Sequence, residues 1–363
     1  MPPDSRDAPL PGPVSCAERG NELDFDGFML IMQGHAAFQL LWAGTQLGLF
    51  TLLSRQPGST SQEIGAALHL EARPTSVLLT GLTALRLVQK DDGGYRNAPI
   101  AQQFLIPGHR DCVVDVLGWQ QHIVYPCAAD LVESLRGDTN AGLKHIPGRG
   151  DTLYARISEN PALERVFHDA MSAISNSANE MLAERMDLSD VRHLVDAGGG
   201  DGTNAIRLVR HHPRLRVTIF DSPSVCRLAE QNIQRAGLSD RIATFPGDLF
   251  HDAFPRDVDC ILFAHMMTIW SLDTDTGLLR RAYESLPATG RVVIFNMMGW
   301  DDERGPISTA LGSVYFLAIA TGEGRLHSWR EYETCLAAAG FGHTERIDLP
   351  RDHGILIGRK SHP

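Results

Sequence analysis

The chain lacks several features that would place it in a specialised class of protein. Its six cysteines are scattered, with no C-x-x-C pair, so metal-ligand spacing and a dense disulfide framework are both absent. No apolar run approaches the length of a membrane span. Residues 1–22 are rich in proline and polar residues and lack the basic-then-apolar pattern of a signal peptide. We therefore expect a cytoplasmic protein without a metal or a membrane span, with a flexible tail at 1–22.

Positive charge is also scarce. The 33 lysines and arginines are outnumbered by 44 aspartates and glutamates, which gives a net charge of −11, and no run of lysine or arginine occurs. Such a surface repels phosphate backbones, so we expect no nucleic-acid partner. The 43% hydrophobic and 21% charged residues are ordinary for a globular protein, and 363 residues suggest about two domains.

The N-terminal part has the order of elements of a winged helix. Residues 25–53 are apolar on nearly every face, which predicts a helix buried on most sides, one of them against another chain. Residues 59–61 form a helix start before a short amphipathic helix, and a further helix is predicted over 74–90. A strand, a turn and a strand follow at 87–96. The fold class expected here is a helical, winged-helix-like domain.

A winged helix often binds DNA, but the basic helix that this requires is missing. Only Arg73, Arg86 and Lys90 supply positive charge in that region, so dimerisation and a role as substrate lid are favoured. Residues 101–190 then predict helices. We expect a dimerisation domain at 23–110, a helical linker and lid at 111–185, and a catalytic domain at 186–363.

From Leu194 onward, short apolar strands alternate with helical segments, which predicts an α/β domain. This rhythm is typical of a Rossmann-like, doubly wound and mostly parallel sheet with helices on both faces. The strand segments are HLVDAGGG, RVTIFDSP, ATFPGDLF, DCILFAHM, GRVVIFNMM and GILIGR.

The strongest local signal is a glycine-rich turn after the first of these strands. It carries an acid-x-G-x-G-x-G pattern formed by Asp196, Gly198, Gly200 and Gly202, and a helix is expected from Thr203. Glycines let the backbone approach a ligand closely, and a helix start presents free N–H groups. A dinucleotide would require a third glycine where Thr203 stands. The pattern instead suits the amino-acid part of S-adenosylmethionine.

Two further turns lie at the ends of the next strands. Asp221 ends the second strand, 25 residues after Asp196, where an acid can bind both ribose hydroxyls. After the third strand, Asp248 can accept a hydrogen bond from the adenine amino group while Leu249 packs on the ring. Ordinary turn chemistry explains any one such turn. Three in this order, at the edge where α/β sheets bind ligands, favour a donor site.

Several motifs resemble the bacterial and plant small-molecule O-methyltransferases of the caffeate/polyketide type over about residues 25–360. They are Val166–Met171, the donor turn, Gly247–Phe250, the Trp270 segment, Gly322–Arg325 and Ala339–Phe341. The resemblance implies a homodimer, S-adenosylmethionine as cofactor with S-adenosylhomocysteine as product, and phenolic substrates held between two domains. The donor-site residues expected from motif and resemblance together are Asp196, Gly198, Gly200, Asp221, Ser222, Gly247, Asp248, Leu249, Phe250 and Ala264.

The sequence departs from this family where its general base should stand. The family segment is Lys-x-x-x-His-Asp-Trp; aligned on Trp270, the lysine is replaced by Ala264 and the histidine by Thr268. The two glutamates that flank this histidine in the plant enzymes correspond to Asn296 and Leu326. Threonine cannot act as a general base near neutral pH.

Three explanations of the missing base stay open: a relocated histidine, an acceptor that ionises by itself, or a ring carbon as nucleophile. The loss tilts the expectation toward C-methylation of a hydroxylated aromatic, amino-acid-like metabolite in secondary metabolism. O-methylation by proximity, a non-methylating reaction and a winged-helix regulator are the alternatives. The catalytic candidates, in order, are His168, His122, His265 and Thr268.

The acceptor site is predicted from side-chain type and neighbourhood alone. An aromatic pocket could be lined by Trp119, Phe167, Met171, Met267, Met297 and Trp300, and polar groups could come from Thr268, Asn176, Asn296 and Tyr315. For each of the six apolar residues, an ordinary place in the protein core is an equally good explanation.

Overall fold

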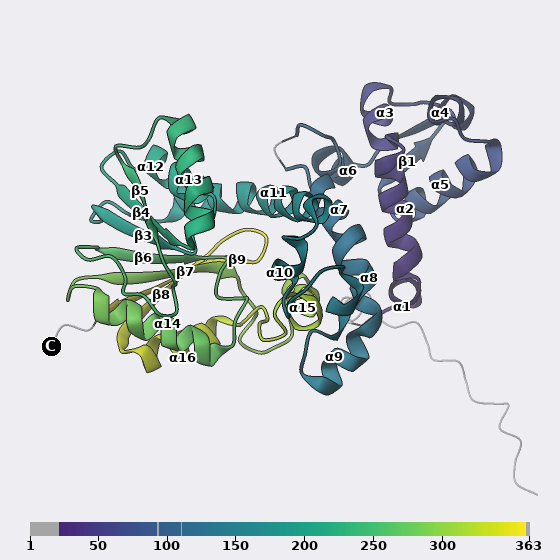
Figure 1. Cartoon of the computed structure of the whole chain (residues 1–363). Coiled ribbons are helices and arrows are strands. Elements are labelled where there is room, and N and C mark those ends of the chain that lie inside the picture. Colours follow the sequence, from purple (N-terminus) through teal and green to yellow (C-terminus); the bar gives the residue numbers. More distant parts are fainter. Residues whose placement is uncertain (1–21, 93, 110, 361–363) are drawn as a thin grey trace, which may run out of the picture. The chain divides into compact units, whose positions relative to one another are not determined.

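The computed structural model of the chain describes residues 22–92, 94–109 and 111–360, apart from the side chains of residues 176 and 177 (Figure 1). The chain forms two compact units, Met1–His109 and Arg110–Pro363.

The first unit combines short helices with one hairpin. Its elements are α1 (Phe25–Met32), α2 (Gly34–Gln46), α3 (Leu49–Arg55), α4 (Ser61–Leu68), α5 (Ala72–Ala84), β1 (Val88–Asp91), β2 (Gly94–Asn97) and α6 (Pro99–Phe104). The hairpin and the Thr60 helix start were predicted correctly, and Thr60 forms a capping box with Glu63. The single helix expected over 25–53 is wrong. The chain breaks at Gln33 and again at Gly48, whose φ of +75° a helix interior cannot accommodate.

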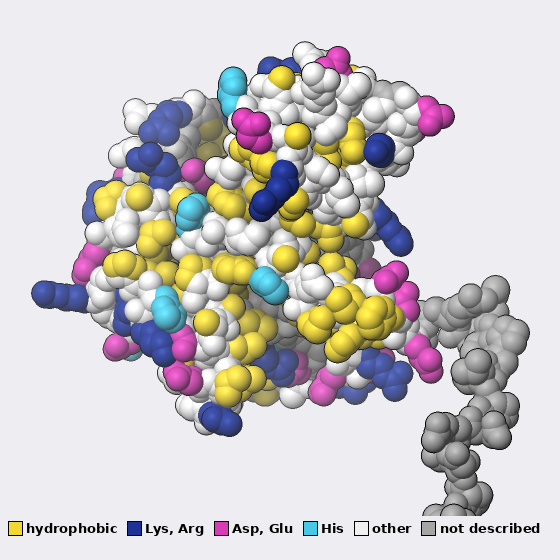
Figure 2. Space-filling view, turned by 90° about the vertical axis from the view of Figure 1, so that its right-hand side faces the viewer, with side chains coloured by type: hydrophobic (Ala, Val, Ile, Leu, Met, Phe, Trp, Pro, Cys, Tyr) yellow, Lys and Arg dark blue, Asp and Glu magenta, His cyan; other side chains and the backbone are white. Residues whose placement is uncertain are grey.

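Helix α1 has no buried residue, although it is strongly apolar. Phe25, Phe28 and Ile31 are 74%, 52% and 68% exposed. On the face drawn in Figure 2, hydrophobic side chains gather in patches among charged side chains of both signs. A continuous apolar helix face exposed in this way needs a partner surface. Among the described residues, no single helix is long and apolar enough to cross a membrane, and only the bent pair α2 and α3 meets that test by length and composition together.

The second unit begins with a helical segment. It contains α7 (Val114–Trp119), η1 (Gln120–Val124), α8 (Tyr125–Cys127), η2 (Ala128–Asp130), α9 (Leu131–Gly137), η3 (Ala141–His145), α10 (Leu153–Ile157) and α11 (Pro161–Arg185). Two later elements, α15 (Ile307–Tyr315) and η4 (Phe316–Ala320), join its apolar core. Segments almost 200 residues apart in the chain therefore form one cluster around Trp119 and Tyr315.

A seven-stranded sheet organises the rest of this unit. Its strands are β3 (His193–Ala197), β4 (Arg216–Asp221), β5 (Ile242–Pro246), β6 (Cys260–Ala264), β7 (Arg291–Met297), β8 (Phe341–Asp348) and β9 (His353–Lys360), in the order β5-β4-β3-β6-β7-β9-β8. The first five are parallel, whereas β9 is antiparallel to β7 and β8 is antiparallel to β9. The predicted doubly wound, mostly parallel sheet is confirmed. Strand β8 was not predicted.

Helices cover both faces of this sheet (Figure 1). Helices α11, α12 (Thr203–His211) and α13 (Pro223–Ala236) pack on one face, and α14 (Leu272–Ser285) and α16 (Trp329–Ala339) pack on the other. The chain runs from β3 outward to β5 and then returns to place β6 on the other side of β3. The carboxyl ends of β3 and β6 thus flank a topological switch point, which is where open α/β sheets bind ligands.

A neutral polar cluster lies between α14, α16 and the sheet. Asp275 is fully buried and neither carboxylate oxygen has a hydrogen-bond partner among the described residues. Burial raises the pKa of Asp275 to about 9, so the carboxyl group is protonated at neutral pH. Asn296 Nδ2 donates a 3.0 Å hydrogen bond to the hydroxyl of the buried Tyr332. These groups remain uncharged in the folded state.

The raised pKa of Asp275 leads to a prediction about stability. The pKa is about 9 in the folded chain and about 3.8 in the unfolded chain, so the protonated form favours folding and stability is lost as pH rises between these values. Asparagine cannot ionise, so Asp275→Asn should gain stability over the native chain by about 1.4 kcal/mol per pH unit between pH 5 and pH 8. Thermal melting across this range measures the gap. The exposed neighbour Asp273→Asn should show no widening gap, and a constant gap for Asp275→Asn would contradict the assignment.

The exposed face of α1 makes a prediction about assembly. Replacing Phe28 and Ile31 together by aspartate places charge on a surface that we expect to pack against a second copy. Sedimentation should then give the 39.8 kDa of one chain in place of twice that mass. Leu228→Asp, an equally simple charge insertion on the exposed part of α13, should leave the dimer intact. A double variant that still sediments as a dimer would rule out this face.

Candidate functional site

The glycine turn after β3 has the backbone that its sequence predicts. Gly198, Gly200 and Gly202 have φ of +71°, +58° and +82°, a region that side chains other than glycine rarely adopt. A Cβ built on Gly200 would meet nothing within 4 Å. The backbone at Gly200 therefore borders open space, into which a ligand can approach. Helix α12 begins at Thr203, as predicted.

The carboxylate of Asp221 joins this turn to the end of β4. Its Oδ2 accepts a 3.0 Å hydrogen bond from the Gly200 amide, and its Oδ1 accepts a 2.7 Å bond from the Ser222 amide. Its backbone carbonyl accepts a 2.9 Å bond from the amide of Gly247, at the end of β5. The ends of three adjacent strands, predicted to form one site, are brought together at this residue.

The third turn is built around Asp248. Its two carboxylate oxygens accept 2.8 Å bonds from the Phe250 amide and from His251 Nδ1, while its own amide donates a 2.8 Å bond to Asp252. The hydrogen bond from His251 is the largest cause that lowers the pKa of Asp248, and the Phe250 amide adds to it. Asp248 is therefore an ionised, exposed acceptor.

Apolar side chains complete the donor cradle. A Cβ on Gly198 would lie 3.0 Å from Met266 Cγ and 3.6 Å from Leu249 Cδ1, so both side chains converge on the glycine turn. Ala264, at the end of β6, lies two residues before Met266 in the chain and is half-buried. An open glycine backbone, two acidic acceptors and an apolar wall fit a ligand with an amino-acid part, a ribose and a base.

Asp196 has a different place from the one expected. It is 0% exposed, and its Oδ2 accepts a 3.3 Å bond from Asn204. Burial, together with a smaller effect of the Asp221 charge, raises its pKa to about 7. A Cβ on Gly199 would lie 2.8 Å from Asp196 Cγ. The side chain lies beneath the turn, so we correct its role from contacting the donor to supporting the glycine backbone.

The acceptor-site candidates fall into two groups. Trp119, Tyr315, Phe167 and Met171 belong to the cluster of the helical segment, where the Trp119 and Tyr315 rings meet edge to face with centroids 4.9 Å apart. The indole N–H of Trp119 is buried without a hydrogen-bond partner among the described residues. Asn176 lies outside the described side chains.

The second group follows the ends of β6 and β7. Met267 and Thr268 are buried, Met297 is half-buried, and Asn296 is fully buried against Tyr332. Trp300 is 51% exposed and lines a cavity of about 380 Å³. This cavity is also lined by Thr309, Ser313, Arg325, Leu326 and Glu331. A cavity thus adjoins Leu326, the position of a family glutamate.

The histidines differ sharply in their surroundings. His168 on α11 has a side chain 62% exposed, 4.0 Å from Glu164, and His122 in η1 is exposed. His265 is enclosed by Phe295 and His353, and burial lowers its pKa to about 3. A group with this pKa is a poor acceptor for a phenol proton, because a phenol has a pKa near 10. The structure therefore does not favour His265 as the base.

Sequence reasoning missed His327, which follows Leu326. Its ring is 3% exposed, and neither nitrogen has a hydrogen-bond partner among the described residues. Burial lowers its pKa to about 4, although Glu331 Oε2 lies 3.9 Å from Nδ1. Its position beside a family glutamate is the signal that could have drawn attention to it. Within the part of the chain that the structure describes, no group of three or more histidine, cysteine, aspartate and glutamate side chains could hold a metal ion.

Comparison with known proteins accounts for both units. An O-methyltransferase dimerisation domain matches residues 29–107, and an O-methyltransferase domain matches residues 128–342. The chain is 41% identical to an L-tyrosine C(3)-methyltransferase of Streptomyces lavendulae, with 93% of both chains covered. It is 32% identical to a 3-hydroxy-5-methyl-1-naphthoate 3-O-methyltransferase of Streptomyces sahachiroi, covering 89% of this chain and 92% of that one.

A solved structure agrees with these matches. The apo form of the S-adenosylmethionine-dependent methyltransferase SibL is 40% identical and superposes with a TM-score of 0.86, covering 93% of this chain and 100% of that one. With its dimerisation domain, its doubly wound sheet and its glycine turn, the chain belongs to the O-methyltransferase family and is an S-adenosylmethionine-dependent methyltransferase.

Proposed function

We propose that this enzyme methylates a ring carbon of a small hydroxylated aromatic amino acid or a close relative of one. The observation that carries the proposal is the 41% identity to an L-tyrosine C(3)-methyltransferase along nearly the whole chain. The loss of the family base supports it. Thr268, Asn296 and Leu326 stand where the histidine and two glutamates of the O-methylating relatives are expected.

The donor residues act by holding and orienting. Bound S-adenosylmethionine supplies a methyl group on a sulfonium centre, and transfer is an in-line displacement that depends above all on positioning. The proposal assigns Asp221 to the ribose hydroxyls, Asp248 to the adenine amino group, and the backbone at Gly198 and Gly200 to the methionine part. The hydrogen bonds of Asp221 to two separate turns support its role, because they fix the carboxylate before any ligand arrives.

The acceptor residues have to raise the reactivity of a ring carbon. An ionised phenol pushes electron density onto the carbons ortho to it, so one of them can attack the methyl group once the phenolic proton is removed. The proton on that ring carbon leaves after the attack, as the ring regains its aromaticity, and the oxygen takes a proton back. His168 and His122 stay the candidates for removal of the phenolic proton in the proposal, whereas His327 is a poor acceptor for the same reason as His265, because burial lowers its pKa to about 4. Thr268, buried beside the end of β6, is assigned to hydrogen bonding with the substrate.

O-methylation is the second candidate, favoured by one observation. The relative at 32% identity is a 3-O-methyltransferase of a hydroxylated naphthoate, so the same fold serves oxygen as nucleophile.

We also propose a homodimer in the cytoplasm, without nucleic-acid or membrane partners. The dimerisation domain supports the first statement, and the net charge of −11 supports the absence of a nucleic-acid partner.

The position of the transferred methyl group tests the proposal. The enzyme is incubated with methyl-¹³C-labelled donor and L-tyrosine, other hydroxylated aromatic amino acids, or simple phenols and catechols, and the product is read by NMR. We expect an aryl-methyl signal and formation of S-adenosylhomocysteine. An aryl-methoxy signal would show that the enzyme methylates oxygen and not carbon. If no acceptor leads to formation of S-adenosylhomocysteine, methyl transfer to this class of substrate is ruled out.

Asp221 tests the donor assignment. Asp221→Asn keeps the shape but removes the charge and one acceptor, and a hydrogen bond to a charged group contributes about 1.5–3 kcal/mol. Calorimetry should therefore show S-adenosylhomocysteine binding weakened by about tenfold to a hundredfold. Asp240→Asn, at an exposed residue before the amino end of β5 and thus away from the carboxyl ends of the strands, is the matched control and should bind normally. Equal affinities for the native chain and Asp221→Asn would place the ribose elsewhere.

A further inference from the structure

The turn that carries Asp248 is compact but exposed. We name residues 247–252 the adenine loop. Inside it, the His251 and Asp252 amides donate bonds of 3.1 and 2.8 Å to the Asp248 carbonyl, and Asp252 accepts from the Asp248 amide. Asp248, His251 and Asp252 are all exposed. These bonds fix the shape of the loop, but they do not fix its place against the sheet.

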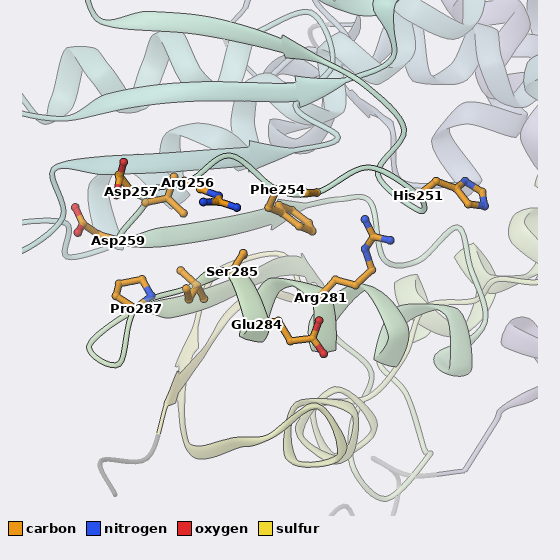
Figure 3. Close-up of a pocket in the computed structure, with 12 residues that line it drawn as sticks. His251, Phe254, Arg256, Asp257, Asp259, Arg281, Glu284, Ser285 and Pro287 are labelled. Carbon is orange, nitrogen blue, oxygen red and sulfur yellow. The ribbon is translucent and has the colours of Figure 1, made fainter.

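One side chain from another element ties this loop down. Arg281 of α14 donates a 2.6 Å bond from Nη1 to the Phe250 carbonyl, and its Nη2 donates to the Asp252 carbonyl. Arg281 rises from α14 toward the segment that carries His251 and Phe254 (Figure 3). These three residues line a cavity of about 950 Å³. The planar fork of a guanidinium suits two carbonyls two residues apart in a turn.

The helix that carries Arg281 is packed firmly against the core. Its helix neighbours Leu278, Leu279 and Ala282 are buried in the core on one face of the sheet. The loop has two further contacts: the Gly247 amide donates a 2.9 Å bond to the Asp221 carbonyl, and the Phe250 ring meets the Trp270 ring edge to face with centroids 4.9 Å apart. Arg281 thus connects a packed helix to the backbone on both sides of His251.

Arg281 also acts on Asp248 through its charge. The guanidinium adds to the hydrogen bonds of His251 and Phe250 in lowering the pKa of Asp248. The arginine therefore holds the backbone of the loop and favours the ionised form of its acceptor. Neither effect requires Arg281 to touch a ligand.

We propose that Arg281 is a positioning residue for the methyl donor, which holds the adenine loop so that Asp248 meets the amino group of the adenine. The proposal rests on the donor assignment of Asp248 made above. It predicts that Arg281 acts on donor affinity through the adenine end and leaves the transfer step unchanged.

The test compares two ligands and three variants of the full-length protein by calorimetry. The ligands are S-adenosylhomocysteine and S-inosylhomocysteine, which lacks the adenine amino group. Arg281→Ala should weaken S-adenosylhomocysteine about tenfold, in line with the loss of hydrogen bonds from a charged donor, and should leave S-inosylhomocysteine nearly unchanged. Arg281→Lys, which can reach only one carbonyl at a time, should fall between. Arg280→Ala, an exposed neighbour on the same helix, is the matched control.

Kinetics give the second readout. With saturating acceptor, Arg281→Ala should raise the KM for S-adenosylmethionine about tenfold at unchanged kcat. Equal weakening of both ligands in Arg281→Ala and Arg281→Lys would show a general structural role and overturn the proposal, as would unchanged affinity for S-adenosylhomocysteine. Asp248→Ala distinguishes a failure of the Asp248 assignment from a failure of the proposed role of Arg281. If it binds S-adenosylhomocysteine normally, the donor assignment fails as well; if it binds weakly while Arg281→Ala binds normally, only the role of Arg281 fails.

Discussion

The carboxylate of Asp221 is the junction on which the donor cradle depends. It accepts hydrogen bonds from the Gly200 and Ser222 amides, and its carbonyl accepts one from Gly247. Parallel strands place their carboxyl ends at one edge, but they do not by themselves set the turns that follow into one surface. Asp221 does this from the middle strand of the three. The positive φ values of the glycine turn are possible because glycine has no Cβ, and the bond from the Gly200 amide to Asp221 ties the turn to the end of β4.

Local patterns in the sequence predicted the fold where neighbours in the chain decide the outcome. The capping box at Thr60 and the glycine turn before Thr203 depend on residues within a few positions. The break at Gly48 was missed because apolar residues continue on both sides of it, and composition gives no sign of a change of direction. Strand β8 was missed because most of its side chains are exposed at the sheet edge, so its sequence, FGHTERID, has no apolar alternation.

The site was predicted in part, for the same reason. Donor residues follow strands directly, so motif and topology place them. Acceptor residues come from distant segments, and only packing decides which side chains meet. Asn296 was expected to face a substrate, and its amide nitrogen instead bonds Tyr332, 36 residues later in the chain. His265 stands close to Thr268 in sequence, but its positive φ of +54° accompanies a ring buried against Phe295. The hydrophobic periodicity of the sequence does not show that the His265 side chain packs against Phe295.

The bond between Asn296 and Tyr332 has a consequence for recognition. The amide nitrogen is committed to the Tyr332 hydroxyl, and Oδ1 is left as a buried oxygen with no partner among the described residues. Where a glutamate stands in the O-methylating plant enzymes, this chain therefore presents an oxygen that neither carries a charge nor exchanges a proton. Such an atom can recognise only a group that brings its own hydrogen. The amide at the end of β7 therefore cannot take up a proton, and its buried oxygen can be satisfied only by a hydrogen-bond donor.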